Sequence, residues 1–455
     1  MSEKSYIDSL VEKARQAQRE LEGFTQEQVD ALVRAMGKVI YDNAEIIARE
    51  AVDESGYGRV DSKIVKLQRC TLAAWHYMHD KKSVGMIDYD PAEKLATFAK
   101  PVGIVAALVP TTNPVSTTVS NGMSIIKSRN AMIVSPHPRT KKVTKHGVDL
   151  MNAELAKLGA PKDLIQIIDE PSMAYTQELM TKVDVVVATG GAAMVKSAYS
   201  SGRPSFGVGP GNVQVVVAPD YTDYEKLAAN VVNSRSYDNG MPCTGEQALH
   251  IPAGKVDDIL AAFQAKGAYV LPDEYAAKLP AILFKENGMT DPAHVGMLPY
   301  KLAALMGLEI PESTTLLLFK SRGMTRENIL RREKLCPVVQ YFPYETFEEG
   351  VANAKSNLEW EGAGHSSVIY TDDQQRAEYA GAQLPVSRLL VNQPGGAASG
   401  GNFINGLHPT MSLGCGSWGN NSISDNLTYR HLMNTTKLAY YHEPTIPAPE
   451  VVWAE

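Results

Sequence analysis

The stretch VDVVVATGGAAMV (183–195) shows most directly how this chain folds. Its apolar run is nearly continuous, which is typical of a parallel strand covered on both faces. The run ends in Thr189-Gly190-Gly191, and a helix-like segment follows. A strand, a glycine turn and a helix in this order leave backbone N–H groups facing a ligand at the carboxyl edge of a sheet. The stretch therefore predicts an α/β fold with a nucleotide site at these three residues.

Apolar runs of the same kind lie on both sides of this stretch. Upstream, helix-like segments separate three of them: VGIVAALVP (102–110), AMIVSP (131–136) and LIQIID (164–169). Downstream there is a second set: NVQVVVAP (212–219), QALHIP (247–252), AYVLP (268–272), SSVIYT (366–371) and SRLLVN (387–392). Alternating buried strands and helices are typical of doubly wound α/β folds. We therefore predict two such domains, at residues 1–220 and 221–425, and a separate segment at 426–455.

Size and charge fit this division and exclude other classes of protein. The chain has 455 residues and is 44% hydrophobic, whereas a single core stops growing at roughly 250–300 residues. Its formal charge is −7, with 44 Lys and Arg against 51 Asp and Glu, which argues against a nucleic-acid surface. No stretch approaches the roughly 18 apolar residues of a membrane span, and the charged first residues do not resemble a secretory signal. We expect a cytoplasmic protein without a membrane partner.

The two ends of the chain leave alternatives open. From Tyr6 to Glu54 the pattern is helical, and the segment from Thr25 to Gln28 resembles a capping box. The amphipathic first helix is either an ordinary packed helix, which we favour, or a docking element for a larger assembly. The segment 426–455 has no strong core pattern, so we expect it to pack on the first domain or on a partner subunit.

The four cysteines are far apart in the sequence, with no CxxC pair and no His-rich partner segment. A disulfide framework or a metal site therefore has no support, and we predict no metal. Cys70 lies in a helical pattern and Cys336 precedes a proline at the expected start of a strand, so both are predicted to be core residues. Cys415 lies in a glycine-rich loop, where no nearby group is placed to activate it.

Cys243 has a different setting, within SYDNGMPCTGEQ (236–247). Asp-Asn-Gly favours a turn and Pro242 removes a backbone donor, while the sequence from Glu246 onward also suggests a helix. A cysteine at a loop-to-helix junction has its thiolate stabilised and its pKa lowered by the helix N-terminus. The local sequence leaves two interpretations open, a nucleophile and a buried structural cysteine.

Three further segments are ambiguous taken singly. GVGPGN (207–212) precedes a strand, whereas a dinucleotide fingerprint follows one, so we predict no phosphate cradle there; a sharp interdomain turn and a close approach to a ligand both fit. In TTNPVS (111–116) the Asn113 amide could donate to an oxyanion or simply serve a turn. His365 comes directly before a strand, where a structural role is common.

Taken together and in order, these segments resemble the aldehyde dehydrogenase family, and more closely its CoA-acylating branch. The matching segments are VPTTNPVST (109–117), ATGGAAMVKSA (188–198), GVGPGN (207–212), SYDNGMPCTGEQ (236–247), EKLCPV (333–338), GAGHSS (362–367) and LGCGSWGNNSISDN (413–426). The resemblance implies an α/β fold of the aldehyde dehydrogenase type. It would consist of a nucleotide-binding domain, a catalytic thiol domain and a C-terminal oligomerisation segment, in a homo-oligomer such as a dimer or tetramer.

The resemblance also implies roles for the residues that match. Cys243 would attack an aldehyde to form a thiohemiacetal, which passes a hydride to a nicotinamide and becomes a thioester. Asn113 and the Cys243 backbone N–H would form the oxyanion hole. NAD is the expected cofactor and NADP the alternative, since the basic cluster at 137–142 is compatible with a 2′-phosphate. The cofactor-binding candidates are Thr111, Ser135, Pro136, His137, Thr189, Gly190, Gly191, Gly209 and Glu333.

This chain differs from the usual family sequence at two places, which bear on the acyl acceptor and on the identity of the aldehyde. Hydrolytic relatives carry a glutamate where this chain has GVGPGN, so CoA is the expected acyl acceptor and coenzyme A a co-substrate; His365 would accept the CoA thiol proton or be purely structural. Arg203, Arg235 and Thr244 also differ from the usual residues. Arginine holds anions bidentately, so the substrate is acetaldehyde or an anionic aldehyde such as sulfoacetaldehyde or succinate semialdehyde, unless the arginines bind CoA phosphates or a structural carboxylate.

Two other functions remain open on the sequence. One is reduction of an acyl phosphate by the same thiohemiacetal chemistry, without CoA. The other is a non-catalytic scaffold protein that keeps the fold.

Overall fold

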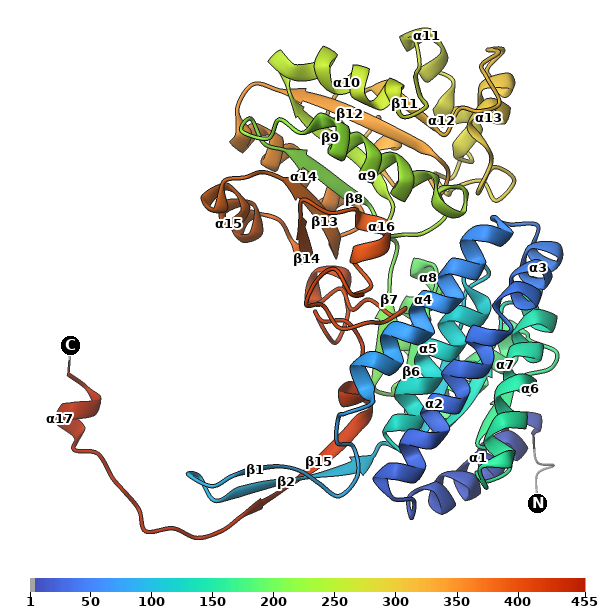
Figure 1. Cartoon of the computed structure of the whole chain (residues 1–455), viewed down its shortest axis with the longest axis vertical. Coiled ribbons are helices and arrows are strands. Elements are labelled where there is room, and N and C mark those ends of the chain that lie inside the picture. Colours follow the sequence, from blue (N-terminus) through green and yellow to red (C-terminus); the bar gives the residue numbers. More distant parts are fainter. Residues whose placement is uncertain (1–4, 455) are drawn as a thin grey trace.

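The computed structural model describes residues 5–454, and its first domain is built on a five-stranded parallel sheet (Figure 1). The strand order is β5-β4-β3-β6-β7. The bounds are β3 Ile104–Leu108, β4 Ala131–Ser135, β5 Ile165–Ile167, β6 Val185–Thr189 and β7 Ser205–Val208. The first four coincide with the apolar runs, whose side chains are buried on both faces, as predicted for a doubly wound sheet.

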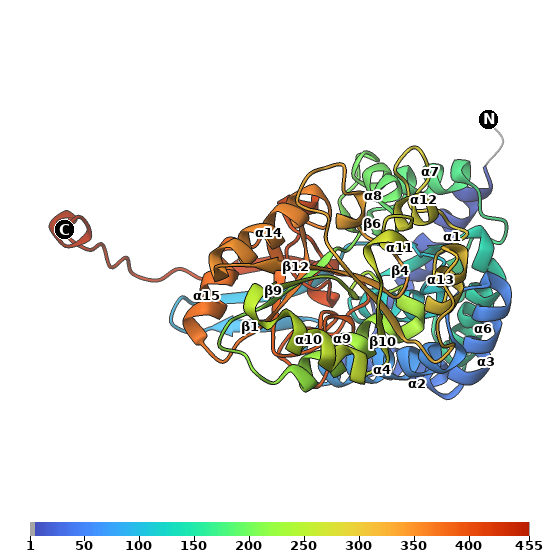
Figure 2. The ribbon, with the colours of Figure 1, turned by 90° about the horizontal axis from the view of Figure 1, so that it is seen from above.

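Helices cover both faces of this sheet (Figure 2). On one side lie α1 (Tyr6–Leu21), α7 (Met173–Lys182) and α8 (Ala192–Tyr199). On the other lie α2 (Gln26–Asp42), α3 (Ala44–Ser55), α4 (Val60–Met78), α5 (Pro114–Lys127) and α6 (Lys141–Lys157). Thr25 caps α2 in a capping box, as predicted. Ile7, Leu10 and Ala14 on α1 are buried in the domain core, so the first helix is an ordinary packed helix.

The second domain contains a seven-stranded parallel sheet of order β10-β11-β12-β9-β8-β13-β14. The bounds are β8 Val213–Val217, β9 Glu246–Pro252, β10 Ala268–Val270, β11 Leu316–Lys320, β12 Val338–Tyr344, β13 Gly364–Tyr370 and β14 Val386–Val391. Helices α9 (Tyr224–Ser236) and α10 (Val256–Ala265) cover one face, and α14 (Phe347–Trp360) and α15 (Gln374–Gln383) cover the other. Side chains of β8 alternate between the two cores, as the period of a strand requires. The predicted fold class is therefore confirmed.

Two boundaries differ from the sequence-based prediction. The segment from Glu246 is strand β9, not a helix, because β8 and β12 pair with its two edges and its residues are buried. The chain leaves the first sheet after β7 and enters the second at β8. Residues 209–212 therefore cross between the sheets, and the predicted boundary at 220 lies too late. The glycine-rich segment is the interdomain connection that its place before a strand suggested.

The third sheet is antiparallel, of order β1-β2-β15, and holds the C-terminal segment against the first domain. Its strands are β1 Met86–Asp90, β2 Leu95–Pro101 and β15 Met433–Ala439. Leu427, Tyr429 and Leu432 are buried in the first domain's core, which is one of the two packings expected for residues 426–455. After β15 the chain extends away from both domains and ends near α17 (Pro449–Val452) (Figure 1).

Short helices complete the described chain. They are α11 Asp273–Ala276, α12 Leu279–Leu283, α13 Pro299–Leu305 and α16 Gly395–Ala398. Among residues 5–454 no helix is both long enough and apolar enough to cross a membrane.

Candidate active site

The strand order of the first domain brings two of the predicted site segments together. From β3 the chain moves outward to β4 and β5, and then returns to β6 on the other side of β3. In open α/β sheets, ligands bind at the carboxyl ends of the strands where the order reverses in this way. Asn113 follows β3 and Thr189 ends β6, and these two strands are paired up to Leu108 and Ala188. The topology therefore places both residues at the reversal point.

An open cleft of about 1490 Å³ lies between this edge and the second domain. Four predicted site residues line it: Asn113, Thr189, Cys243 and Thr244. Helix α4 adds Lys66, Arg69 and Cys70, which the sequence analysis did not assign to a site. The second domain contributes further lining residues: Asn230, Asn233, Ser234, Tyr237, Pro242, Pro394, Gly396, Ala397, Gly400, Gly401, Asn402, Pro409, Thr410, Met411 and Leu413.

The loop that carries Cys243 is a tight turn, as Asp-Asn-Gly predicts. Asp238, Asn239 and Gly240 have φ angles of 47°, 56° and 71°, so the backbone of Tyr237–Gly240 is a kinked turn and not a regular helix. Such left-handed backbone is uncommon for residues other than glycine, and Asp and Asn tolerate it best. At Gly240 a Cβ would lie 2.5 Å from the Cys336 carbonyl carbon. This position therefore requires glycine for both its φ angle and its close approach.

Arg235 stabilises this loop through hydrogen bonds. Its side chain is fully buried, and Nη1 donates to the Gly240 carbonyl at 3.1 Å while Nη2 donates to Gln247 Oε1 at 3.1 Å. Arg203 lies on the surface, where Nη2 donates to the Thr181 carbonyl at 2.8 Å at the end of α7. Neither arginine lines the cleft. The geometry argues against the substrate role predicted for both, because each guanidinium already serves the backbone.

The electrostatic setting of Cys243 also differs from the prediction. A strand, β9, follows the loop, so the loop does not lead into the helix whose N-terminus was expected to stabilise the thiolate. Burial raises the pKa of the Cys243 thiol to about 12, with Glu333 and Cys415 acting in the same direction and Lys66 opposing them. Burial likewise raises the pKa of Glu333 to about 8, so this carboxyl is protonated at pH 7. The predicted lowering of the thiol pKa by a helix N-terminus is therefore wrong.

Residues 209–212, which connect the two domains, pack directly against the loop that carries Cys243. A Cβ at Gly211 would lie 1.9 Å from the Cys243 carbonyl oxygen, so the close backbone approach here is between two parts of the protein. The Gly211 N–H donates to Glu333 Oε1 at 3.3 Å. No carboxylate is present in GVGPGN (207–212) itself.

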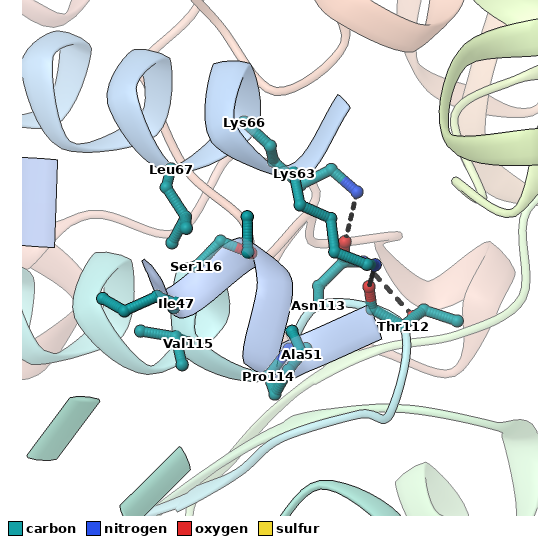
Figure 3. A pocket seen from close by; sticks show the side chains of 11 residues that line it. Ile47, Ala51, Lys63, Lys66, Leu67, Thr112, Asn113, Pro114, Val115 and Ser116 are labelled. Atoms are coloured by element: carbon teal, nitrogen blue, oxygen red, sulfur yellow. Dashed lines mark hydrogen bonds between the residues drawn. The ribbon is translucent and has the colours of Figure 1, made fainter. Parts of the chain in front are cut away.

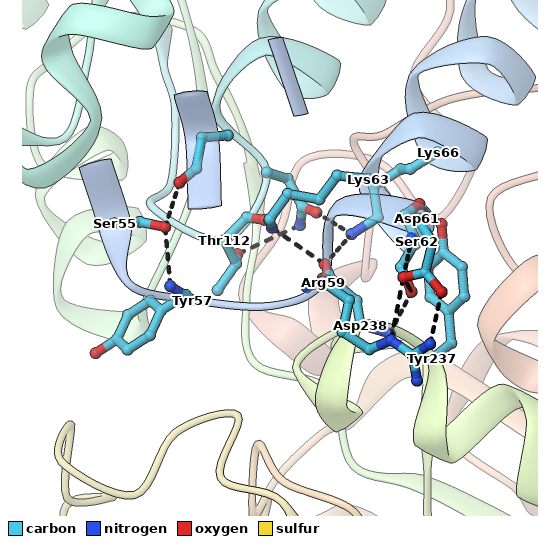
Figure 4. A network of polar contacts seen from close by, with 12 residues as sticks. Ser55, Tyr57, Arg59, Asp61, Ser62, Lys63, Lys66, Thr112, Tyr237 and Asp238 are labelled. Carbon is cyan, nitrogen blue, oxygen red and sulfur yellow. Dashed lines mark hydrogen bonds and ion pairs between the residues drawn. The ribbon is translucent and has the colours of Figure 1, made fainter. Parts of the chain in front are cut away.

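A charged network beneath Asn113 was not predicted from the sequence (Figures 3 and 4). Lys66 Nζ donates to Asn113 Oδ1 at 2.6 Å and to Asp238 Oδ2 at 2.8 Å, while Lys63 Nζ donates to the Thr112 carbonyl at 3.1 Å and to Asp238 Oδ2 at 3.2 Å. The two lysines stand three residues apart on one face of α4, which was the sequence signal available.

The first part of the candidate cofactor site has open backbone at the sheet edge. Helix α8 begins after Gly191, no side chain caps it, and a Cβ at Gly191 would meet nothing within 4 Å. The uncapped N–H groups at the reversal point fit a dinucleotide phosphate. Thr189 lines the cleft, and its Oγ1 lies 3.2 Å from Ser412 Oγ. Gly190 lies beside it, and Gly209 has open space around it.

The remaining cofactor candidates are less available. Ser135 is buried and its Oγ lies 2.9 Å from Thr176 Oγ1, so its side chain already has a partner. Pro136 is buried, His137 is exposed, and both follow β4 at the same sheet edge. Thr111 is half-buried after β3 and does not line the cleft.

His365 does not line the cleft. It is fully buried, and neither ring nitrogen has a hydrogen-bond partner within residues 5–454. Burial lowers the pKa of His365 to about 3, so the ring is neutral at pH 7. Its position favours the structural alternative over a role in accepting a proton from CoA.

Among the other three cysteines, the burial of Cys70 differs from the prediction. Cys336 and Cys415 are buried. Cys70 is only partly buried and lines the cleft, with Sγ 3.4 Å from the Leu67 carbonyl. Burial raises the pKa of Cys70 to about 12. The described part of the chain contains no cluster of three or more His, Cys, Asp or Glu side chains that could hold a metal.

Known proteins share both this sequence and this fold. A sequence model of the aldehyde dehydrogenase family matches residues 1–271. The acetylating succinate-semialdehyde dehydrogenase of Clostridium kluyveri is 48% identical over 455 residues, which cover 100% of both chains. An acetylating aldehyde dehydrogenase structure from Geobacillus thermoglucosidasius has a TM-score of 0.93 at 35% identity, covering 97% of this chain and 98% of that one.

A further solved structure bears on the cleft. The propionaldehyde dehydrogenase of Rhodopseudomonas palustris, determined with bound CoA and an acylated cysteine, has a TM-score of 0.84 at 26% identity, covering 95% of this chain and 97% of that one. Because the family match spans more than half of the chain and a full-length relative shares 48% of its residues, the chain belongs to the aldehyde dehydrogenase family, in its acylating branch.

Proposed function

We propose that this enzyme oxidises a short-chain aldehyde with NAD and transfers the acyl group from Cys243 to CoA, in a reversible reaction. The observation that carries the proposal is the cleft, in which Cys243, Asn113 and Thr189 meet at the point where the strand order reverses. The solved propionaldehyde dehydrogenase with CoA and an acylated cysteine supports the same use of a thiol.

In the first step the Cys243 thiol loses its proton to solvent, its sulfur forms a bond to the aldehyde carbon, and the carbonyl π electrons move to oxygen. The new alkoxide needs preorganised donors. The Asn113 Nδ2 group and the Cys243 backbone N–H supply them. The bound nicotinamide would accept the hydride that leaves this carbon, with Thr189 and the open N–H groups after Gly191 holding the dinucleotide.

In the second step the thioester on Cys243 is attacked by the CoA thiolate, and the Cys243 thiolate leaves. Water competes only if a base activates it. GVGPGN (207–212) carries no carboxylate, and Glu333, which faces the same loop, is protonated at pH 7 because its pKa is about 8. The protein therefore protects the thioester until CoA arrives.

We further propose that the substrate is an anionic aldehyde such as succinate semialdehyde or sulfoacetaldehyde, with acetaldehyde as the alternative. Arg69 lines the cleft on the same helix face as Lys66. Its guanidinium has no hydrogen bond or ion pair to any residue that the structure describes, so it is free to hold a carboxylate or sulfonate bidentately. Arg69 thus takes the role that the sequence analysis gave to Arg203 and Arg235. The named activity of the Clostridium kluyveri relative supports this choice.

Replacing Arg69 with Gln tests the substrate class. The KM for succinate semialdehyde should rise about tenfold, as expected for the loss of one charged hydrogen bond, while the KM for acetaldehyde should stay within about twofold. Steady-state kinetics with both aldehydes at saturating CoA measure this difference. A rise in the KM for CoA alone would instead assign Arg69 to the CoA phosphates.

The surroundings of β4 favour NAD over NADP. In the basic cluster at 137–142, Arg139 donates to Tyr57 Oη at 2.8 Å and to the Ser55 carbonyl at 2.7 Å. Lys141 pairs with Glu170 at 2.5 Å. Arg139 and Lys141 are therefore engaged within the protein, and Lys142 is the cation of this cluster whose side chain has no hydrogen bond or ion pair within residues 5–454. A cytoplasmic location and a homo-oligomeric state stay predictions.

One assay separates the proposal from the alternatives. The enzyme should reduce an acyl-CoA with NADH and form NADH from aldehyde, NAD and CoA, but should not reduce an acyl phosphate. Reduction of acyl phosphate without CoA would favour the reductase. Absence of both activities together with absence of nucleotide binding by calorimetry would favour a scaffold protein.

A further inference from the structure

We propose that Lys66 is a positioning residue for this reaction: its ammonium group fixes the Asn113 carboxamide with an N–H toward the Cys243 cleft, and Asp238 holds Lys66 in place. The inference rests on the proposed function, in which Asn113 stabilises an oxyanion. It adds a cluster outside the residues that contact the reacting atoms.

The contact between Lys66 and Asn113 determines which way the amide faces. Lys66 Nζ lies 2.6 Å from Asn113 Oδ1 (Figure 3). An ammonium group carries donors only, so the oxygen of the carboxamide must face it. The Asn113 Nδ2 group then points away from Lys66, and its contact with Thr112 Oγ1 is long, at 3.3 Å. One strong N–H donor therefore remains for a ligand in the cleft that both Asn113 and Lys66 line.

Asp238 fixes the ammonium group in turn. Its side chain is fully buried, and it binds Lys66 at 2.8 Å and Lys63 at 3.2 Å (Figure 4). The Arg59 backbone N–H donates to its other oxygen at 2.9 Å. Although burial opposes ionisation, the two lysines hold the pKa of Asp238 below its usual value. The carboxylate is therefore charged and cannot release Lys66 without losing its own compensation.

The cluster joins three segments that are distant in the sequence. Lys66 lies on α4 and Asn113 follows β3. Asp238 lies five positions before Cys243, in the same loop. A Cβ at Gly58 would lie 2.1 Å from Asp238 Oδ1, so glycine is needed where the α4 entry meets this carboxylate. The network therefore fixes the position of Asn113, the proposed oxyanion donor, relative to the loop that carries Cys243.

The charges also favour the reaction itself. Burial and the neighbouring Lys66 lower the pKa of Lys63 to about 8, which is still above pH 7. Two ammonium groups and one carboxylate leave an excess positive charge next to the Asn113 amide. This charge acts through the carboxamide, because an ammonium group bound to Asn113 Oδ1 polarises the amide and strengthens its Nδ2 donor toward a developing oxyanion.

A double-mutant cycle tests the proposal with Lys66→Met, Asn113→Ala and the two combined. Lys66→Met should lower kcat for CoA-dependent aldehyde oxidation about tenfold to hundredfold, less than the roughly 10²–10³ lost with an oxyanion donor, because the amide remains. The KM for aldehyde should stay within about threefold. In the Asn113→Ala background the same change should cost less than about threefold, since it acts through Asn113.

Two further variants make the cycle decisive. Lys66→Arg keeps charge and donors and should recover most of kcat, whereas Lys38→Met, which removes an exposed lysine of α2 paired with Asp42, should leave kcat unchanged. If a thermal unfolding measurement shows that Lys66→Met is not folded, Lys66→Gln replaces it in the cycle. Multiplicative losses in the cycle, or a Lys66→Met variant whose kcat stays within about threefold of wild type, would overturn the proposal. If Asn113→Ala itself costs nothing, the proposed function fails instead.

Discussion

Cys243→Ala is expected to abolish turnover, with kcat for CoA-dependent aldehyde oxidation at least about 10⁴-fold lower, because the covalent route is lost entirely. The side chain is small and lies at the cleft wall, so the fold should survive the change. NAD binding should persist, since Thr189 and the N–H groups after Gly191, which are proposed to hold the dinucleotide, lie in the first domain. Stopped-flow NADH fluorescence and calorimetry measure the two properties separately.

Cys70 provides the matched control for this variant. It lines the same cleft and has a pKa raised to about 12, as Cys243 has. Cys70→Ala should keep most of the activity, because its sulfur contacts the Leu67 carbonyl on its own helix. If Cys70→Ala were the inactive variant and Cys243→Ala the active one, the nucleophile would have to be reassigned.

Asn113→Ala is expected to lower kcat about 10²- to 10³-fold, the usual cost of removing one oxyanion donor. The KM for aldehyde should change little, because the donor acts mainly on the charge that develops during the reaction. Single-turnover measurements of NADH formation, which isolate the chemical step, give the cleanest value.

A matched amide controls for nonspecific effects of truncation. Asn233 also lines the cleft but has no role in the proposed steps, so Asn233→Ala should stay within about threefold of wild type. Equal losses in the two variants would mean that cleft shape, not the donor at Asn113, sets the rate.

The strands of both domains were predictable because buried parallel strands leave a simple mark in sequence. Val185 to Thr189 and Val213 to Val217 are nearly all apolar and are buried on both faces of their sheets. The helix expected from Glu246 was wrong because the segment pairs with β8 and β12 and its polar side chains find partners in distant parts of the chain. Glu246 Oε1, for example, accepts the Gly395 N–H at 2.7 Å. Local sequence does not reveal such tertiary partners.

The candidate site was predictable only where a residue type and a strand end coincide. Asn113 and Thr189 follow strands whose order places them together, and Cys243 was singled out by its turn. Arg203 and Arg235 were assigned to the substrate because a guanidinium can bind either a ligand or the backbone of the protein. The sequence does not show which of these partners it has. Lys66 and Asp238 are 172 positions apart, so no sequence spacing could have joined them to Asn113.

In the proposed reaction Cys243 carries an acyl group that is protected from water until CoA accepts it. Mixing micromolar enzyme with NAD and succinate semialdehyde in the absence of CoA tests it most directly, with acetaldehyde in parallel. We expect a burst of one NADH per Cys243, then arrest, and renewed turnover when CoA is added. Sustained NADH formation without CoA, at the rate seen with CoA and with release of the free acid, would contradict it.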